Sequence, residues 1–142
     1  MILLSTNNFL EKFPVSLSGE SYEDTRGSLV WASARYVFSN SYKNVFRGLH
    51  IDPRFFLNKD FDQIKTIVIL EGLLTEYIVC MDDRSNDYLK VFTCNLQSGD
   101  SFSIPNGWAH GFYTSTNCRM LYLIEGSSSN YLNESYTTKE LK

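Results

Sequence analysis

The sequence predicts an all-β protein, a sandwich or a barrel built from many short strands. Three observations lead to this prediction. Short strand-like runs recur through most of the chain, and turn-forming residues separate them. Aromatic residues make up 15% of the sequence, which favours strands and a ring-lined cavity over a helical bundle. Segments with helical periodicity are almost absent, and the sequence contains no internal repeat.

Length and composition indicate a single globular domain. We expect the 142 residues to form one domain, with a core over about residues 20–126 and a polar tail at 127–142. The net charge of -3 disfavours nucleic-acid binding, which needs a basic surface. No stretch approaches the roughly 20 apolar residues of a membrane-spanning helix. The N-terminus also lacks the basic and apolar pattern of a signal peptide.

The cysteines indicate a reducing compartment. The chain has three, Cys80, Cys94 and Cys118, each in a separate apolar run, and none of them forms a Cys-x-x-Cys pair. An odd number of dispersed cysteines is not a disulfide framework. We therefore expect small buried thiols and a cytoplasmic location.

Polar, turn-forming segments alternate with apolar runs in the N-terminal half. Thr6 or Asn7 can cap a short helix whose apolar face includes Phe9 and Phe13 and which Pro14 ends. The elements predicted in this half are, in order, a helix within 5–14, a strand at 15–17, a loop at 20–27, one or two strands within 28–38, a turn at 39–44, a strand at 45–50 and a loop at 52–62.

Strand signals follow one another closely in the C-terminal half. The β-branched run 64–70 and the run 73–81 flank the turn Glu71-Gly72 and predict a hairpin. In the segment Pro105-Asn106-Gly107, glycine can adopt the positive φ that a tight turn requires. The remaining predicted elements are strands at 88–96, 102–104, 108–114 and 119–124 and turns at 82–87 and 98–100.

Two glycine-containing segments hold the only two histidines of the chain. They are Arg47-Gly48-Leu49-His50 and residues 105–112, Pro-Asn-Gly-Trp-Ala-His-Gly-Phe, which include His110. The unperturbed pKa of histidine lies near neutrality, so its side chain can accept a proton at pH 7. If both imidazoles face one cavity, they can support acid–base chemistry there.

Other catalytic classes find little support in the sequence. Two histidines without a His-x-His pair do not supply the three ligands of a usual catalytic zinc or iron site, so we expect no metal. The chain has no Gly-x-Ser-x-Gly segment, no cysteine beside a histidine and no glycine-rich phosphate loop. Acid–base chemistry is the class that remains.

Proton abstraction next to a carbonyl needs a base, a cation near the developing enolate and an acid. A neutral histidine can be the base, and Lys65 and Arg47 can supply positive charge. Strand alternation places Lys65 on the same face as apolar core residues, where a lysine is unusual unless it has a function or a partner. Tyr122, on the inward face of the last strand, can return a proton. Taken singly, each of these residues also fits an ordinary structural role.

The two histidine segments closely resemble the two signature segments of the dTDP-4-dehydrorhamnose 3,5-epimerase family. Further matches follow in the family's order, and the resemblance extends from about residue 20 to residue 131. They are Asp24-Thr25-Arg26-Gly27 for the family's D-x-R-G, Lys65 ahead of a strand and the Glu71-Gly72 turn, Met81-Asp82-Asp83-Arg84-Ser85 for its V-D-x-R-x-S turn, and Tyr122 one residue short of the family distance from the second segment.

This resemblance implies a cupin-type jelly roll, usually a homodimer, that uses no cofactor. It implies a nucleotide-diphosphate sugar as substrate, a 4-keto-6-deoxyhexose inverted at C3, at C5 or at both in deoxysugar and lipopolysaccharide biosynthesis. His50 would take the proton, Lys65 would stabilise the enolate and Tyr122 would reprotonate the opposite face. The residues implied to bind the substrate are Arg26, Arg47, His110 and Tyr131.

Two alternatives remain beside the epimerase. Family members continue past the position of Lys142 and there supply an aspartate that orients the catalytic histidine. Asp82 or Asp83 is the substitute expected in this chain. Without such an aspartate, the sequence also fits a non-catalytic cupin that binds a nucleotide sugar. A 3,4-ketoisomerase of the same fold is the third possibility, although those enzymes usually carry another histidine where this chain has Ile51-Asp52. The sequence identifies neither the nucleotide nor the sugar.

Overall fold

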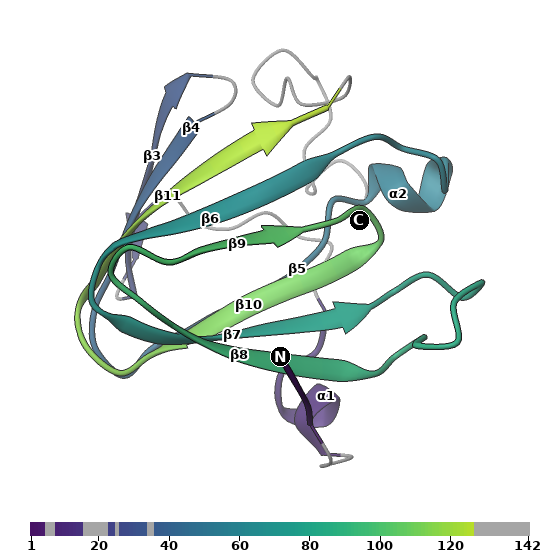
Figure 1. Cartoon of the computed structure of the whole chain (residues 1–142), viewed down its shortest axis with the longest axis horizontal. Helices are drawn as coiled ribbons and strands as arrows, with labels where there is room; N and C mark the ends of the chain where they lie inside the picture. The colour runs from purple at the N-terminus through teal and green to yellow at the C-terminus, as the bar shows by residue number, and fades with distance from the viewer. Residues whose placement is uncertain (5–7, 16–22, 25, 34–35, 127–142) are drawn as a thin grey trace.

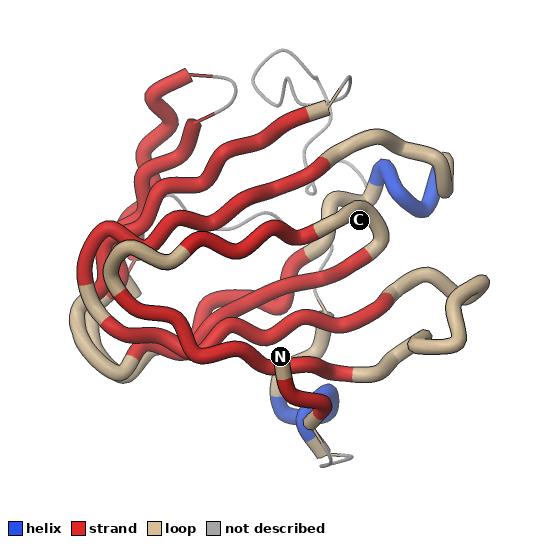
Figure 2. The backbone as a smooth tube through the Cα atoms, viewed as in Figure 1, coloured by secondary structure: helices blue, strands red, loops and turns tan. Residues whose placement is uncertain are grey.

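Two antiparallel sheets face each other in the computed structural model of the chain (Figures 1 and 2). The structure describes all residues except 5–7, 16–22, 25, 34–35 and 127–142. The predicted tail and most of the strand predicted at 15–17 lie outside the described residues. No helix in the described part of the chain is long and apolar enough to cross a membrane.

The first sheet has five strands in the order β1-β8-β7-β10-β5, and the second has six in the order β2-β3-β4-β11-β6-β9. Strands distant in sequence are thus neighbours in each sheet, which confirms the predicted all-β jelly-roll sandwich. The strands are β1 (Ile2–Leu3), β2 (Glu23–Asp24), β3 (Gly27–Ser33), β4 (Tyr36–Ser41), β5 (Phe46–His50), β6 (Ile64–Glu71), β7 (Leu73–Cys80), β8 (Val91–Gln97), β9 (Ser101–Ile104), β10 (Trp108–Thr114) and β11 (Cys118–Glu125).

Alternating side chains of the two sheets form the core between them. Ile67 and Ile69 of β6 meet Leu74 of β7 and Phe112 of β10 in one buried cluster. A second apolar cluster covers the outer face of the five-stranded sheet, where Phe9 stacks on Tyr77 with 4.7 Å between ring centroids. The two faces of the five-stranded sheet therefore differ: one encloses the interior and the other packs against the N-terminal segment and the loop after β5.

A β-bulge in β5 brings two predicted site residues to the interior. His110 pairs with His50 and Phe112 pairs with Arg47, so two steps along β10 match three steps along β5. Without the extra residue, side chains three positions apart in a strand would point to opposite faces. Cross-strand partners share a face, so both Arg47 and His50 lie on the interior side with Phe112.

Several predicted elements differ from the observed ones. β2 (Glu23–Asp24) and the first residue of β3 lie within the loop predicted at 20–27. The helix predicted within 5–14 is α1 (Phe9–Lys12). The loop predicted at 52–62 contains α2 (Arg54–Leu57). Asp52, which precedes this helix, accepts a hydrogen bond from the Arg54 backbone N–H at 2.9 Å. β4 continues to Ser41, because the small Ser39 and Ser41 side chains fit the buried face. β8 begins only at Val91, since Leu89 has a φ of 65° and belongs to a turn.

The Gly48→Ala substitution should strongly destabilise the protein. Gly48 has a φ of 110°, and a Cβ there would lie 2.6 Å from the Gly111 Cα and 2.7 Å from the His110 carbonyl oxygen. We expect the free energy of unfolding to fall by about 3 kcal/mol or more in urea denaturation. Gly99→Ala is the control: its φ is 93° but nothing lies within 4 Å, so only about 1–2 kcal/mol should be lost. Equal losses would contradict a steric requirement at Gly48.

Candidate active site

The structure brings together four predicted site residues on the interior side of the sandwich. His50 and His110 are paired across β5 and β10, in the five-stranded sheet. Lys65 and Tyr122 come from β6 and β11 of the opposite sheet, where Tyr122 is buried and Lys65 precedes the buried Ile67 on the same strand face. The two sheets thus each supply part of one cluster.

Within the cluster, His110 of the five-stranded sheet contacts residues of the six-stranded sheet. Its Nε2 lies 3.4 Å from the Lys65 Nζ, and its ring centroid lies 6.2 Å from that of Tyr122. The Lys65 ammonium itself lies 5.9 Å from the Tyr122 ring centroid, within range of a cation–π interaction. Lysine, imidazole and phenol therefore occupy one small region, as the acid–base hypothesis requires.

The surroundings of His110 keep its imidazole neutral. Burial lowers the pKa of His110 well below its ordinary value, and the nearby Lys65 and His50 lower it further. A neutral imidazole can accept a hydrogen bond at one nitrogen and donate at the other, whereas an imidazolium can only donate. His110 can therefore act as an acceptor for the Lys65 ammonium.

Glu76 is a site residue that the sequence interpretation missed. Its side chain is 0% exposed, and its Oε1 lies 3.5 Å from the Nδ1 of His110. Burial raises the pKa of this carboxyl well above its ordinary value, and the Lys65 ammonium opposes that shift. The available signal was a glutamate at the inward position of β7 between Leu74 and Ile78, where an apolar residue is the rule.

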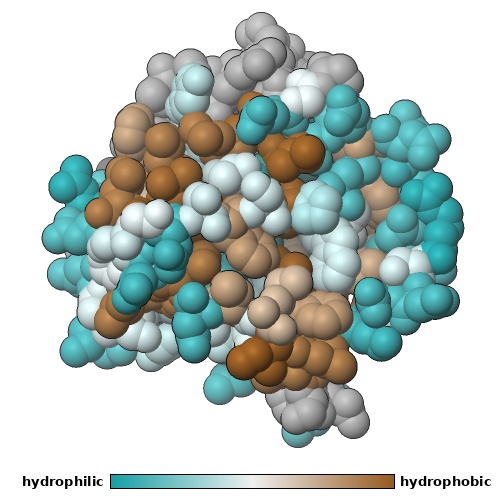
Figure 3. Space-filling model, in the orientation of Figure 1, coloured by the Kyte–Doolittle hydropathy of each residue, from teal (hydrophilic) through white to brown (hydrophobic). Residues whose placement is uncertain are grey.

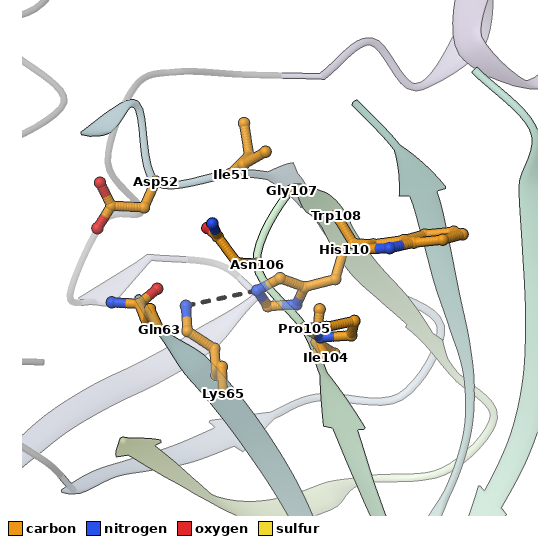
Figure 4. Close-up of a pocket in the computed structure, with 10 residues that line it drawn as sticks. All are labelled: Ile51, Asp52, Gln63, Lys65, Ile104, Pro105, Asn106, Gly107, Trp108 and His110. Atoms are coloured by element: carbon orange, nitrogen blue, oxygen red, sulfur yellow. Dashed lines mark hydrogen bonds between the residues drawn. The ribbon is translucent and has the colours of Figure 1, made fainter. Parts of the chain in front are cut away.

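A cleft opens beside Lys65 and His110. Figure 4 shows the Gln63 and Asn106 amides near the Lys65 ammonium and the His110 ring. Gly107, with a φ of 87°, forms the turn at the rim, and the Met81 backbone N–H donates to its carbonyl at 2.8 Å. The lining residues are Ile51, Asp52, Gln63, Lys65, Ile104, Pro105, Asn106, Gly107, Trp108 and His110.

Arg47, one of the two predicted arginines, lies on the interior side, where it is 3% exposed. β3 begins next to Arg26 and pairs there with Ser41, which pairs with Cys118 of β11. Lys65 pairs with residue 124, at the other end of β11. At about 3.3 Å per residue, the two ends of this strand are roughly 20 Å apart. Within one chain, the backbone of Arg26 is therefore distant from Lys65.

The remaining predictions concern Asp82, Tyr131 and metal binding. The Asp82 carboxylate accepts hydrogen bonds from the Arg84 guanidinium at 2.9 and 3.0 Å, which lower the pKa of Asp82 to about 2. The carboxylate beside a histidine is Glu76 rather than Asp82. Tyr131 lies outside the described residues. In the part of the chain that the structure describes, no three His, Cys, Asp or Glu side chains form a group that could hold a metal ion.

Comparison with known proteins identifies the family. The family model described as dTDP-4-dehydrorhamnose 3,5-epimerase matches residues 15–139. No curated protein sequence matches the chain at the significance that we require of a relative.

Solved structures of such epimerases share the fold. The enzyme from Sulfolobus tokodaii is 25% identical, with a TM-score of 0.56, over 70% of this chain and 52% of that one. The enzyme from Elizabethkingia anophelis NUHP1 is also 25% identical, with a TM-score of 0.56, over 65% and 50% of the two chains. This chain thus spans about half the length of these relatives. From the family match over most of its length, the chain belongs to the dTDP-4-dehydrorhamnose 3,5-epimerase family.

Proposed function

We propose that this protein is an epimerase that inverts C3, C5 or both in a nucleotide-linked 4-keto-6-deoxyhexose. The observation that carries the proposal is the contact of Lys65 with His110, beside Tyr122 and opposite the paired His50. Such a cluster contains the base, the cation and the acid that proton exchange next to a ketone needs. Family membership supports the same reaction class.

In the proposed reaction, the neutral His50 imidazole removes the proton from the carbon next to the ketone. The electrons of the broken C–H bond form the enolate, and the Lys65 ammonium stabilises the negative charge on its oxygen. The Tyr122 hydroxyl then delivers a proton to the opposite face of the carbon, which inverts the centre. The His50 imidazolium then loses its proton to solvent, and the Tyr122 phenolate gains a proton from solvent. Both residues are thereby restored to their starting state.

The substrate class follows from the family and from related structures. An epimerase structure from Bacillus anthracis str. Ames, 23% identical to this chain, holds TDP and pyrophosphate, and a structure from Streptococcus suis holds dTDP-D-xylose. For this chain we infer a nucleoside-diphosphate sugar, which Arg47, His110 and Tyr131 help to bind. Deoxysugar synthesis for lipopolysaccharide or another surface polysaccharide is the corresponding pathway class.

The His50→Asn substitution should abolish proton exchange. In deuterated water, the wild-type protein should introduce deuterium at C3 or C5 of the keto sugar, and the variant should do so at least about 10³-fold more slowly. Mass spectrometry of dTDP-, CDP-, GDP- and UDP-linked keto sugars measures this exchange. Binding of a nucleotide sugar without any exchange by the wild-type protein would refute the epimerase proposal and favour the binding cupin.

Tyr122→Phe should separate proton removal from inversion. His50 can still remove the proton, so deuterium incorporation should continue, whereas formation of the inverted sugar should fall about 10²-fold or more. The control is Tyr113→Phe, because Tyr113 lies on the outer side of β10 and donates to Asn44 at 3.2 Å. Equal product yields from the two variants, measured by chromatography, would contradict the role of Tyr122.

We also infer a homodimer that completes each site. Apolar side chains gather on the outer face of the six-stranded sheet (Figure 3), where Phe38 and Val68 both pair with Leu121. Phe38 is 42% exposed there, which leaves apolar surface for a second copy to bury. The distance between Arg26 and Lys65 along β11 further supports a site to which a second subunit contributes its Arg26.

Subunit mixing tests this arrangement. Arg26→Ala and His50→Asn should each be inactive alone, but an equimolar mixture of the two, after random exchange of subunits, should regain about one quarter of the wild-type rate. Half of its dimers are then heterodimers, and one of the two sites in each heterodimer receives both intact residues. Light scattering should give twice the chain mass. A monomeric mass, or no recovery in the mixture, would exclude the shared site.

We also propose that the protein is located in the cytoplasm. Cys80, Cys94 and Cys118 are all free thiols, as is usual for proteins in a reducing environment.

A further inference from the structure

Two buried polar groups in the core face each other. Both Glu76 oxygens and the Nδ1 of His110 are buried, and none has a hydrogen-bond partner of good geometry among the described residues. Oε1 of Glu76 and Nδ1 of His110 are 3.5 Å apart. An unsatisfied buried polar group costs about 1–3 kcal/mol, and a charged one costs more. A small approach of the two side chains would satisfy both groups.

The contact at the other nitrogen determines which partner donates. The Lys65 Nζ lies 3.4 Å from the Nε2 of His110. A lysine ammonium has three donors and no acceptor, so Nε2 must accept. In a neutral imidazole the proton then resides on Nδ1, where it points at Glu76. The contact between Lys65 and His110 and the contact between His110 and Glu76 thereby each join a donor to an acceptor. The opposite tautomer would place Nε2–H against the ammonium.

We propose that Glu76 is a positioning residue: it accepts the Nδ1–H of His110, fixes this tautomer and so holds the Lys65 ammonium in place through Nε2. This carboxyl group acts from β7 through His110 on a lysine of the opposite sheet. It has an oxygen that can accept the hydrogen bond in either protonation state. Glu76 itself touches no reacting atom in this arrangement.

The consequence for catalysis rests on the proposed epimerase function. The Lys65 ammonium must stay protonated and aimed at the enolate oxygen. A single well-placed donor to such an oxygen contributes about 10²–10³ in rate. Loss of Glu76 leaves Lys65 in the chain but releases His110, so the effect should be smaller than that of removing Lys65.

Nitrogen-15 NMR tests the tautomer without any substrate. The chain has only two histidines, and the spectrum of His110→Asn identifies the signals of His110 by their absence. At pH 7 the wild-type protein should show a protonated Nδ1, an unprotonated Nε2, and a downfield Nδ1–H protected from solvent. A protonated Nε2 of His110, or a His110 imidazolium, would overturn the proposal.

Two variants of similar volume isolate the acceptor. Glu76→Gln keeps an oxygen that can accept from Nδ1, so the tautomer should persist. Glu76→Met fills the space without an acceptor, and its His110 should show Nε2–H or an average of both forms. A Glu76→Met spectrum identical to that of the wild type would refute the role of Glu76.

Deuterium exchange into a keto sugar tests the catalytic consequence. Glu76→Met should lower kcat about 10- to 100-fold with little change in KM, and Glu76→Gln should lower it less. An altered tautomer with an unchanged kcat would overturn the positioning role. If the wild-type protein exchanges no sugar, the epimerase proposal fails, while the NMR spectra still decide how Glu76 and His110 interact.

Discussion

The close approach of β5 and β10 at Gly48 and Gly111 is the constraint on which the candidate site depends. A Cβ at Gly111 would lie 2.5 Å from the Arg47 carbonyl oxygen, and one at Gly48 would meet the backbone of β10. Only glycine allows this contact and the bulge beside it. The bulge turns Arg47 and His50 to the same interior face. The backbone packing of β5 against β10 therefore also sets the positions of these candidate site side chains.

A second constraint is the polar series that crosses the core. Glu76 and His110 belong to the five-stranded sheet and Lys65 to the six-stranded one, so the series Glu76–His110–Lys65 links the two layers. Burial penalises every charge in it, which raises the pKa of Glu76 and lowers that of His110. The neutral imidazole of His110 can accept a hydrogen bond from the Lys65 ammonium and donate one to Glu76. An arrangement of this kind gives an ammonium inside a sandwich a polar partner.

Aromatic packing and cation–π contacts support the rim of the cleft. The turn at Gly107 approaches Phe55 of α2 closely enough that a Cβ would lie 3.2 Å from its ring. Lys59 covers the rings of Phe55 and Phe56 at 4.6 and 5.1 Å. The helix that the sequence interpretation missed therefore supports the turn that precedes His110. These contacts help to place the start of β10, and with it His110.

Local sequence determined the strands, the tight turns and most of the candidate site, because alternation, glycine and the two histidine segments are properties of short stretches. Lys65 and Tyr122 could be assigned to inward faces by the same alternation. Glu76 was missed, since a single glutamate in a strand is ordinarily exposed, and only the neighbouring β10 shows that it faces a histidine. The bulge at Gly48, the separation of Arg26 from Lys65 and the pairing of Asp82 with Arg84 also needed the tertiary structure. These three features depend on which strands become neighbours and in what register. Contacts between residues far apart in the chain determine both the strand order and the register.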